Sequence, residues 1–150
     1  MNADYLKLTS YFAERQRTKS GFLADSMLDL FAARGVAGSV MLRGIAGFGH
    51  RGFIRTDEKL TLSEDPSVTI EAIDTAETIS ALVGDVTAMT SSGLITLERA
   101  TMLGDDPATV SLPDGDDQIK LTMYVGRGRR IDGRPAFYTI CELLHQHHFA

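Results

Sequence analysis

The feature that most constrains the fold of this chain is the order in which two hydrophobic periodicities alternate along its first two thirds. Apolar residues at every second position predict a strand, and apolar residues spaced near 3.6 positions predict a helix. Strand-like stretches lie at residues 5–12, 39–45, 68–73 and 94–103, and helical stripes follow the first and the third. This order is that of a split β-α-β domain. The sequence therefore predicts an α+β, ferredoxin-like fold, with a four-stranded antiparallel sheet and both helices on one face.

Both predicted helices carry start and stop signals. Ser20 can cap the first helix and Gly35 can end it, whereas Thr75 can cap the second, which should end near Gly93. The apolar stripes expected to face the sheet are Leu23, Met27, Leu30 and Phe31 in the first helix, and Ile79, Leu82, Val83, Val86 and Met89 in the second.

A change of composition marks the end of this first domain, which we assign to residues 1–103. Residues 104–117 hold five aspartates, two prolines and no basic residue. Such a stretch is typical of a solvated linker.

Beyond the linker, the beginning of the chain recurs. Residues 119–124, IKLTMY, align with residues 6–11, LKLTSY, and the same offset places Arg130 over Arg17 and Leu143 over Leu30. Internal repetition changes the interpretation of a whole chain. We interpret residues 118–150 as a truncated second copy, an isolated β-α half repeat. Its unpaired strand, expected at residues 119–125, and its apolar helix face should dock on the first domain's sheet edge or on the equivalent segment of a neighbouring chain.

Charge and cysteine content narrow the partners and the compartment. The net charge of -5 argues against a nucleic-acid partner, because phosphate backbones require a dense basic surface. Cys141 is the single cysteine, so an intramolecular disulfide is excluded and an oxidising compartment is not required. No apolar run approaches the roughly 20 residues that span a bilayer, and residues 1–12 lack the core of a signal peptide. We therefore expect a cytoplasmic protein without membrane insertion.

Several strings in the first domain resemble one family. They are VMLRGIAGFG at 40–49, LSED at 62–65, VTIEAID at 68–74 and GLITLE at 93–98, and the second copy adds KLTMY at 120–124 and DGRP at 132–135. Together they resemble the uncharacterised bacterial PII-like family, which shares the fold of the trimeric nitrogen-regulatory PII proteins. The resemblance implies a trimeric signalling module. Because members are often encoded near fluoride exporters, it also suggests a membrane transporter or channel as partner.

The same resemblance implies a ligand site. PII proteins bind adenine nucleotides and 2-oxoglutarate in clefts between subunits, and a long loop after their second strand touches the regulated partner; here that loop would be residues 47–64. Glycines at the loop base can turn backbone N–H groups toward an anion, and arginines add charge. PII proteins also hold phosphates with a glycine- and lysine-rich stretch after the second helix, where this chain has a glycine but no lysine. The candidate ligand-binding residues are Arg43, Gly44, Gly47, Phe48, Gly49, His50, Arg51, Gly52 and Gly93. No particular cofactor is indicated.

Two other functions compete with this one. Cys141, His145 and His148 would share a helix face and are ligands for a soft divalent ion, which makes a metal-binding or metal-tolerance protein of the same architecture the alternative. The competing interpretation is a core-facing cysteine with histidines at a frayed helix end. Enzyme chemistry would need a nucleophile and a base supported by a third group. His50 with Asp57 or Glu58 could form an acid–base pair, but no nucleophile with a supporting third group accompanies it, so we expect no enzyme.

Overall fold

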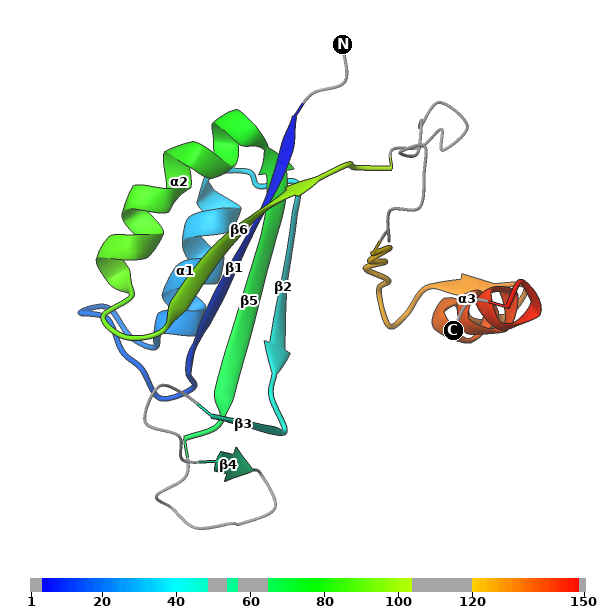
Figure 1. Cartoon of the computed structure of the whole chain (residues 1–150), viewed down its shortest axis with the longest axis horizontal. Coiled ribbons are helices and arrows are strands. Elements are labelled where there is room, and N and C mark those ends of the chain that lie inside the picture. Colours follow the sequence, from blue (N-terminus) through cyan, green and yellow to red (C-terminus); the bar gives the residue numbers. More distant parts are fainter. Residues whose placement is uncertain (1–3, 49–53, 57–64, 104–119, 149–150) are drawn as a thin grey trace. The chain divides into compact units, whose positions relative to one another are not determined.

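The structure, a computed structural model, describes residues 4–48, 54–56, 65–103 and 120–148 (Figure 1). They fall into two compact units, Met1–Val110 and Ser111–Ala150, which we describe separately.

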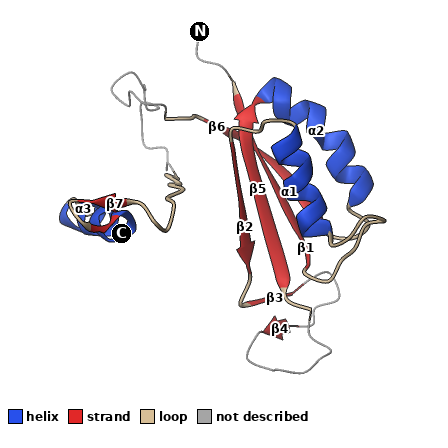
Figure 2. Ribbon diagram, turned by 180° about the vertical axis from the view of Figure 1, so that it is seen from behind, coloured by secondary structure: helices blue, strands red, loops and turns tan. Residues whose placement is uncertain are grey.

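The first unit has the predicted element order with a small hairpin inserted. Its elements are β1 (Tyr5–Ala13), α1 (Leu23–Ala33), β2 (Gly38–Arg43), β3 (Ala46–Phe48), β4 (Ile54–Thr56), β5 (Ser67–Thr75), α2 (Ala76–Met89) and β6 (Leu94–Ala100). Four strands form one antiparallel sheet in the order β2-β5-β1-β6, and β3 pairs with β4 separately. Both helices cover the same face of the sheet (Figures 1 and 2). The predicted ferredoxin-like fold is confirmed.

The hydrophobic core lies between this face and the two helices. Strands β1 and β5 are the central pair, and every second residue of each faces the helices. The buried side chains are Leu8, Phe12, Val68, Ile70 and Ala72 from the sheet, and Leu23, Met27, Phe31, Ile79, Leu82 and Val86 from the helices. Each large apolar side chain buried here stabilises the fold by roughly 1.5–3 kcal/mol. Of the two predicted stripes, Leu30, Val83 and Met89 are only partly buried.

The helix ends confirm three signals and correct one. The Thr75 hydroxyl accepts a hydrogen bond from the Thr78 backbone N–H, as expected of a cap. Gly35 has a φ of 65° directly after α1, and α2 ends at Met89, just before Gly93. Ser20, however, does not cap α1, which begins at Leu23. Its hydroxyl is instead in hydrogen-bonding contact with other side-chain hydroxyls.

Within the described residues of the first unit, no helix lies on the other face of the sheet (Figure 2). Large side chains on it are exposed: Tyr11 to 41%, Leu42 to 51% and Leu94 to 57%. We call this surface the uncovered face. Antiparallel sheets can present one face to solvent, but such a face is usually polar.

The second unit contains a short hairpin and one helix: β7 (Arg130–Ile131), β8 (Arg134–Pro135) and α3 (Ala136–Gln146). Arg134 binds the Glu142 carboxylate through two nitrogens at 2.8 and 2.7 Å, which ties the hairpin to α3. A strand was expected at 119–125, but residues 120–125 belong to no strand. A strand needs a ladder partner, and none pairs with these residues among those described. No helix in the described part of the chain has the length and apolar character needed to cross a membrane.

Candidate functional site

The candidate site lies at the end of the sheet where β2 leaves it and β5 enters. Arg43, the last residue of β2, pairs directly with Val68 near the start of β5. A hairpin of two to five residues would suffice to join strands so placed. Instead the chain inserts residues 44–66, including the β3–β4 hairpin. We call the point where this loop leaves the sheet the neck.

Two glycines close the neck against Ser67. The Gly44 backbone N–H donates to the Ser67 carbonyl oxygen at 2.8 Å. A Cβ on Gly44 would overlap the Ser67 hydroxyl oxygen, and a Cβ on Gly47 would lie 3.2 Å from that same atom. Gly44 therefore allows the backbones of β2 and β5 to approach closely, and Gly47 leaves room for the Ser67 side chain.

Charged groups surround the neck. The Arg43 guanidinium binds the Glu14 carboxylate, with Nε to Oε1 at 3.0 Å. The Arg15 backbone N–H donates to Asp65 Oδ1 at 2.7 Å, which fastens the returning end of the loop to the segment after β1. An anion at this position would compete with the Glu14 carboxylate for the Arg43 guanidinium.

Gly93 lies at the same end of the sheet. It immediately precedes Leu94, which pairs with Tyr11. Its φ is 146°, and a Cβ there would collide with the Tyr11 carbonyl oxygen. The structure thus brings four predicted residues, Arg43, Gly44, Gly47 and Gly93, to one end of the sheet, although Gly93 is fully explained by this close strand contact.

Of the remaining predicted ligand residues, the structure describes only Phe48. Phe48 ends β3, and its backbone pairs with Ile54. Gly49, His50, Arg51 and Gly52 lie outside the described residues, as do Asp57 and Glu58.

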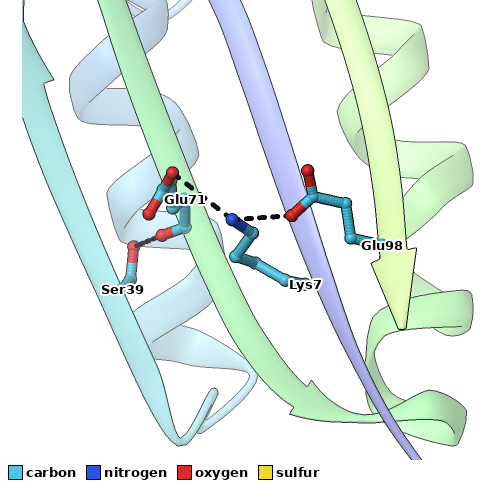
Figure 3. Close-up of polar contacts among 4 residues, drawn as sticks. All are labelled: Lys7, Ser39, Glu71 and Glu98. Carbon is cyan, nitrogen blue, oxygen red and sulfur yellow. Dashed lines mark hydrogen bonds and ion pairs between the residues drawn. The ribbon is translucent and has the colours of Figure 1, made fainter. Parts of the chain in front are cut away.

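A second polar feature lies on the uncovered face (Figure 3). Lys7, on central strand β1, is only 8% exposed. Its Nζ lies 2.7 Å from Glu98 Oε2 on β6 and 3.7 Å from Glu71 Oε1 on β5. The hydrogen bond to Glu98 and the charges of both carboxylates raise the Lys7 pKa against the opposing effect of burial. One ammonium group therefore links three strands.

The predicted metal ligands are not assembled into a cluster. Cys141 is exposed, and α3 ends at Gln146, so the helical spacing reaches His145 but not His148, which has a φ of 57°. Within the described ranges no group of three or more histidine, cysteine or acidic side chains is placed to hold an ion.

Sequence reasoning missed Glu14, Ser67 and Asp65 at the neck. Glu14 and Ser67 belong to no motif, Asp65 only ends the LSED string, and each acquires its role through a partner more than ten residues away. The one available signal was position, because all three lie within three residues of a predicted strand.

Comparison with solved structures shows low sequence similarity. CPII, a nitrogen regulatory PII-like protein from Thiomonas intermedia K12 solved with ADP, AMP and bicarbonate, is 18% identical, with a TM-score of 0.49, 66% of this chain and 90% of that chain covered. The divalent ion tolerance protein CutA1 from Ehrlichia chaffeensis is 11% identical, with a TM-score of 0.48, 70% of this chain and 89% of that chain covered. The ligands and activities in these names are those of the two proteins.

A family model covers the whole described sheet of the first unit. Residues 5–102, more than half of the chain, match the model named DUF190 and described as "Uncharacterized ACR". This match agrees with the uncharacterised family that the strings of the first domain indicated. The chain belongs to the DUF190 family.

Proposed function

We propose that this protein is a cytoplasmic regulatory module, not an enzyme, which binds a small ligand, a nucleotide or an anion, at the neck in a cleft between subunits. The loop of residues 47–64 would carry the signal to a partner protein, for which a membrane transporter or channel is our candidate. The observation that supports this most is the insertion of residues 44–66 between directly paired ends of β2 and β5. Loops longer than about 12–15 residues inside compact domains usually serve a function.

The neck offers the right chemistry for an anionic ligand. Arg43 is 60% exposed at its side chain, although it is paired with Glu14. Its planar guanidinium can bind a phosphate or carboxylate through two nitrogens. The glycines beside it leave backbone groups unshielded by side chains.

The intersubunit cleft requires association, and the uncovered face supplies a surface for it. Exposed apolar side chains that gather on one face of a sheet favour burial against a partner. The resemblance to PII proteins makes a trimer the expected form. The metal-tolerance alternative would need an ion site, and no group of three or more histidine, cysteine or acidic side chains is placed to form one among the described residues.

A thermal-shift screen tests ligand binding at the neck. A ligand that binds only the native state raises the melting temperature with concentration. We expect a nucleotide, dicarboxylate or inorganic anion to do so for the wild type and to lose most of this effect in Arg43→Gln. Arg34→Gln is the matched control, because Arg34 is a similarly exposed arginine paired with Asp85 away from the neck. Equal shifts in both variants would contradict a site at Arg43, and a response to divalent cations alone would favour the metal alternative.

A further inference from the structure

The second unit reproduces the local backbone structure that surrounds α1. An antiparallel bridge joins Arg17 to Phe22 before α1, and at the same offset β7–β8 joins Arg130 to Pro135 before α3. Four backbone hydrogen bonds also recur, all between 2.8 and 3.1 Å. In the first unit, with the donor first, these bonds are Gln16 to Ala13, Leu23 to Gln16, Arg34 to Leu30 and Gly35 to Ala32. Their equivalents in the second unit, in the same order, are Arg129 to Gly126, Ala136 to Arg129, His147 to Leu143 and His148 to His145.

The helices themselves correspond in length and in ending. α1 and α3 each have 11 residues, and their first residues, Leu23 and Ala136, stand at that offset. Gly35 follows α1 with a φ of 65°, and His148 follows α3 with a φ of 57°. The left-handed conformation is uncommon for residues other than glycine. Its occurrence at His148, the position equivalent to Gly35, is therefore a specific similarity between the two units.

The helix positions that form a core in the first unit are incompletely covered in the second. In α1, Leu23, Ala24, Met27 and Phe31 are buried. The residues at the same places in α3 are Ala136, Phe137, Ile140 and Leu144. Of these only Ala136 is buried, and Phe137 is 45% exposed.

The strand positions show the same contrast. Leu8, Ser10 and Phe12 of β1 are at most 4% exposed. Their equivalents are all apolar and all exposed: Leu121 to 51%, Met123 to 44% and Val125 to 37%. The second unit therefore presents the face of a ferredoxin-like core, from one strand segment and one helix, and its own described residues do not cover this face.

The first unit shows what can cover such a face. Its centre consists of two β-α pieces, β1 with α1 and β5 with α2. The two strands are antiparallel, with the midpoint Thr9 opposite the midpoint Glu71, and both helices lie on the same face (Figure 1). Two β-α pieces so arranged are related by an approximate two-fold axis through the strand pair. Two identical pieces can form the same arrangement, and an isologous two-fold contact closes after two subunits.

We propose that residues 120–148 of two copies of this chain associate around a two-fold axis and together form the β-α/β-α centre of a ferredoxin-like domain. Residues 120–125 pair antiparallel with their counterparts, and the α3 helices cover the same side of the new strand pair. This association uses residues other than those of the uncovered face of the first unit. It does not depend on ligand binding at the neck.

The position of Thr9 in the first unit predicts the register. Its equivalent is Thr122, so Thr122 lies opposite Thr122 of the second copy, Leu121 lies opposite Met123, and Lys120 lies opposite Tyr124. This register keeps Leu121 and Met123 on the side of the helices. It also places the arginine-rich turns of residues 127–134 at opposite ends of the strand pair, so that their charges are separated.

Cysteine cross-linking tests this register in the full chain. In a Cys141→Ser background, Thr122→Cys should form a disulfide-linked dimer when copper(II) phenanthroline accepts the two electrons. Directly opposed residues have Cα atoms about 4.5–5.5 Å apart, within the range of a disulfide. Lys120→Cys alone is the matched control on the same strand face. Its two copies would lie about 13 Å apart and should not link. A mixture of Lys120→Cys and Tyr124→Cys chains should link to each other.

Equal cross-linking at 122 and 120, or none at either, overturns the proposal. The second of these results is the one expected if residues 120–125 pair with the sheet edge of the first unit.

The mass of the assembly provides an independent measurement. Thr122→Lys places two like charges directly opposite each other, which destabilises strand pairing. Thr122 is exposed in the single chain, so this change leaves the fold of each copy intact. Light scattering should show half as many chains per particle for Thr122→Lys as for the wild type, whereas the control Thr122→Ser should match the wild type. An unchanged mass for Thr122→Lys would also overturn the proposal.

Discussion

Gly93 shows how one absent Cβ determines the contact between two strands. At this position the chain has a φ of 146° and lies against the Tyr11 carbonyl. Gly93→Ala should therefore lower the free energy of unfolding by about 1–3 kcal/mol. Gly84, on the exposed side of α2, has no atom within 4 Å of a built Cβ, so Gly84→Ala should raise it by roughly 0.5–1 kcal/mol. Urea denaturation measures both, and equal effects would show that the Gly93 contact is unimportant.

The ion pairs of Lys7 should make the free energy of unfolding depend on pH in the alkaline range. Its pKa is raised in the folded state, first by the hydrogen bond to Glu98, so the protonated form favours folding. That stabilisation is fully present below the ordinary lysine pKa of 10.5 and is lost as the pH rises through the higher folded value. Lys7→Met should be less stable than the wild type at pH 7, and the difference should narrow above pH 10.5. Unfolding at both pH values in both proteins separates this effect from tyrosine titration; a constant difference would contradict it.

At the scale of elements, Thr75 and Ser20 form a natural pair of helix-start variants. Thr75→Ala removes the hydroxyl that accepts from Thr78 at the start of α2, and should cost about 1 kcal/mol of stability. Ser20→Ala should cost much less, because Ser20 caps no helix and its hydroxyl is solvent-exposed. Serine and threonine are both favoured at helix N-caps, so the sequence could not show which of the two residues would cap its helix. The bridge from Arg17 to Phe22 delays the start of α1 beyond the reach of Ser20.

At the scale of the whole molecule, periodicity predicted all four main strands and both helices of the first unit, because each depends on local spacing. The neck glycines were also predictable, because a close contact that leaves no room for a side chain requires glycine, and glycines are visible in the sequence. Glu14 and Ser67 were not, because their roles arise only when β1, β2 and β5 align. Residues 120–125, where the sequence predicted part of a strand, form none among the described residues, because a strand needs a paired neighbour.

The uncovered face gives the whole molecule its predicted state of association. Burial of Tyr11, Leu42 and Leu94 between subunits should make the protein an oligomer at micromolar concentration, with the trimer as its basic unit. Leu42→Lys, on exposed edge strand β2, should weaken this association without unfolding the subunit. Sedimentation velocity measures both proteins. A monomeric wild type would remove the intersubunit cleft, and with it the proposed ligand site.

The direct junction of β5 and α2 makes the two halves of the first unit mechanically unequal. β5 ends at Thr75 and α2 begins at Ala76, whereas residues 14–22 separate β1 from α1. β5 therefore connects the neck rigidly to α2: it starts at Ser67 in the neck and continues into the helix without an intervening loop. A displacement of Ser67 along the strand would move the start of α2 directly, because no loop separates β5 from α2, whereas nine residues separate β1 from α1. A change at the neck would thus reach the start of α2, at the opposite end of the sheet, through β5.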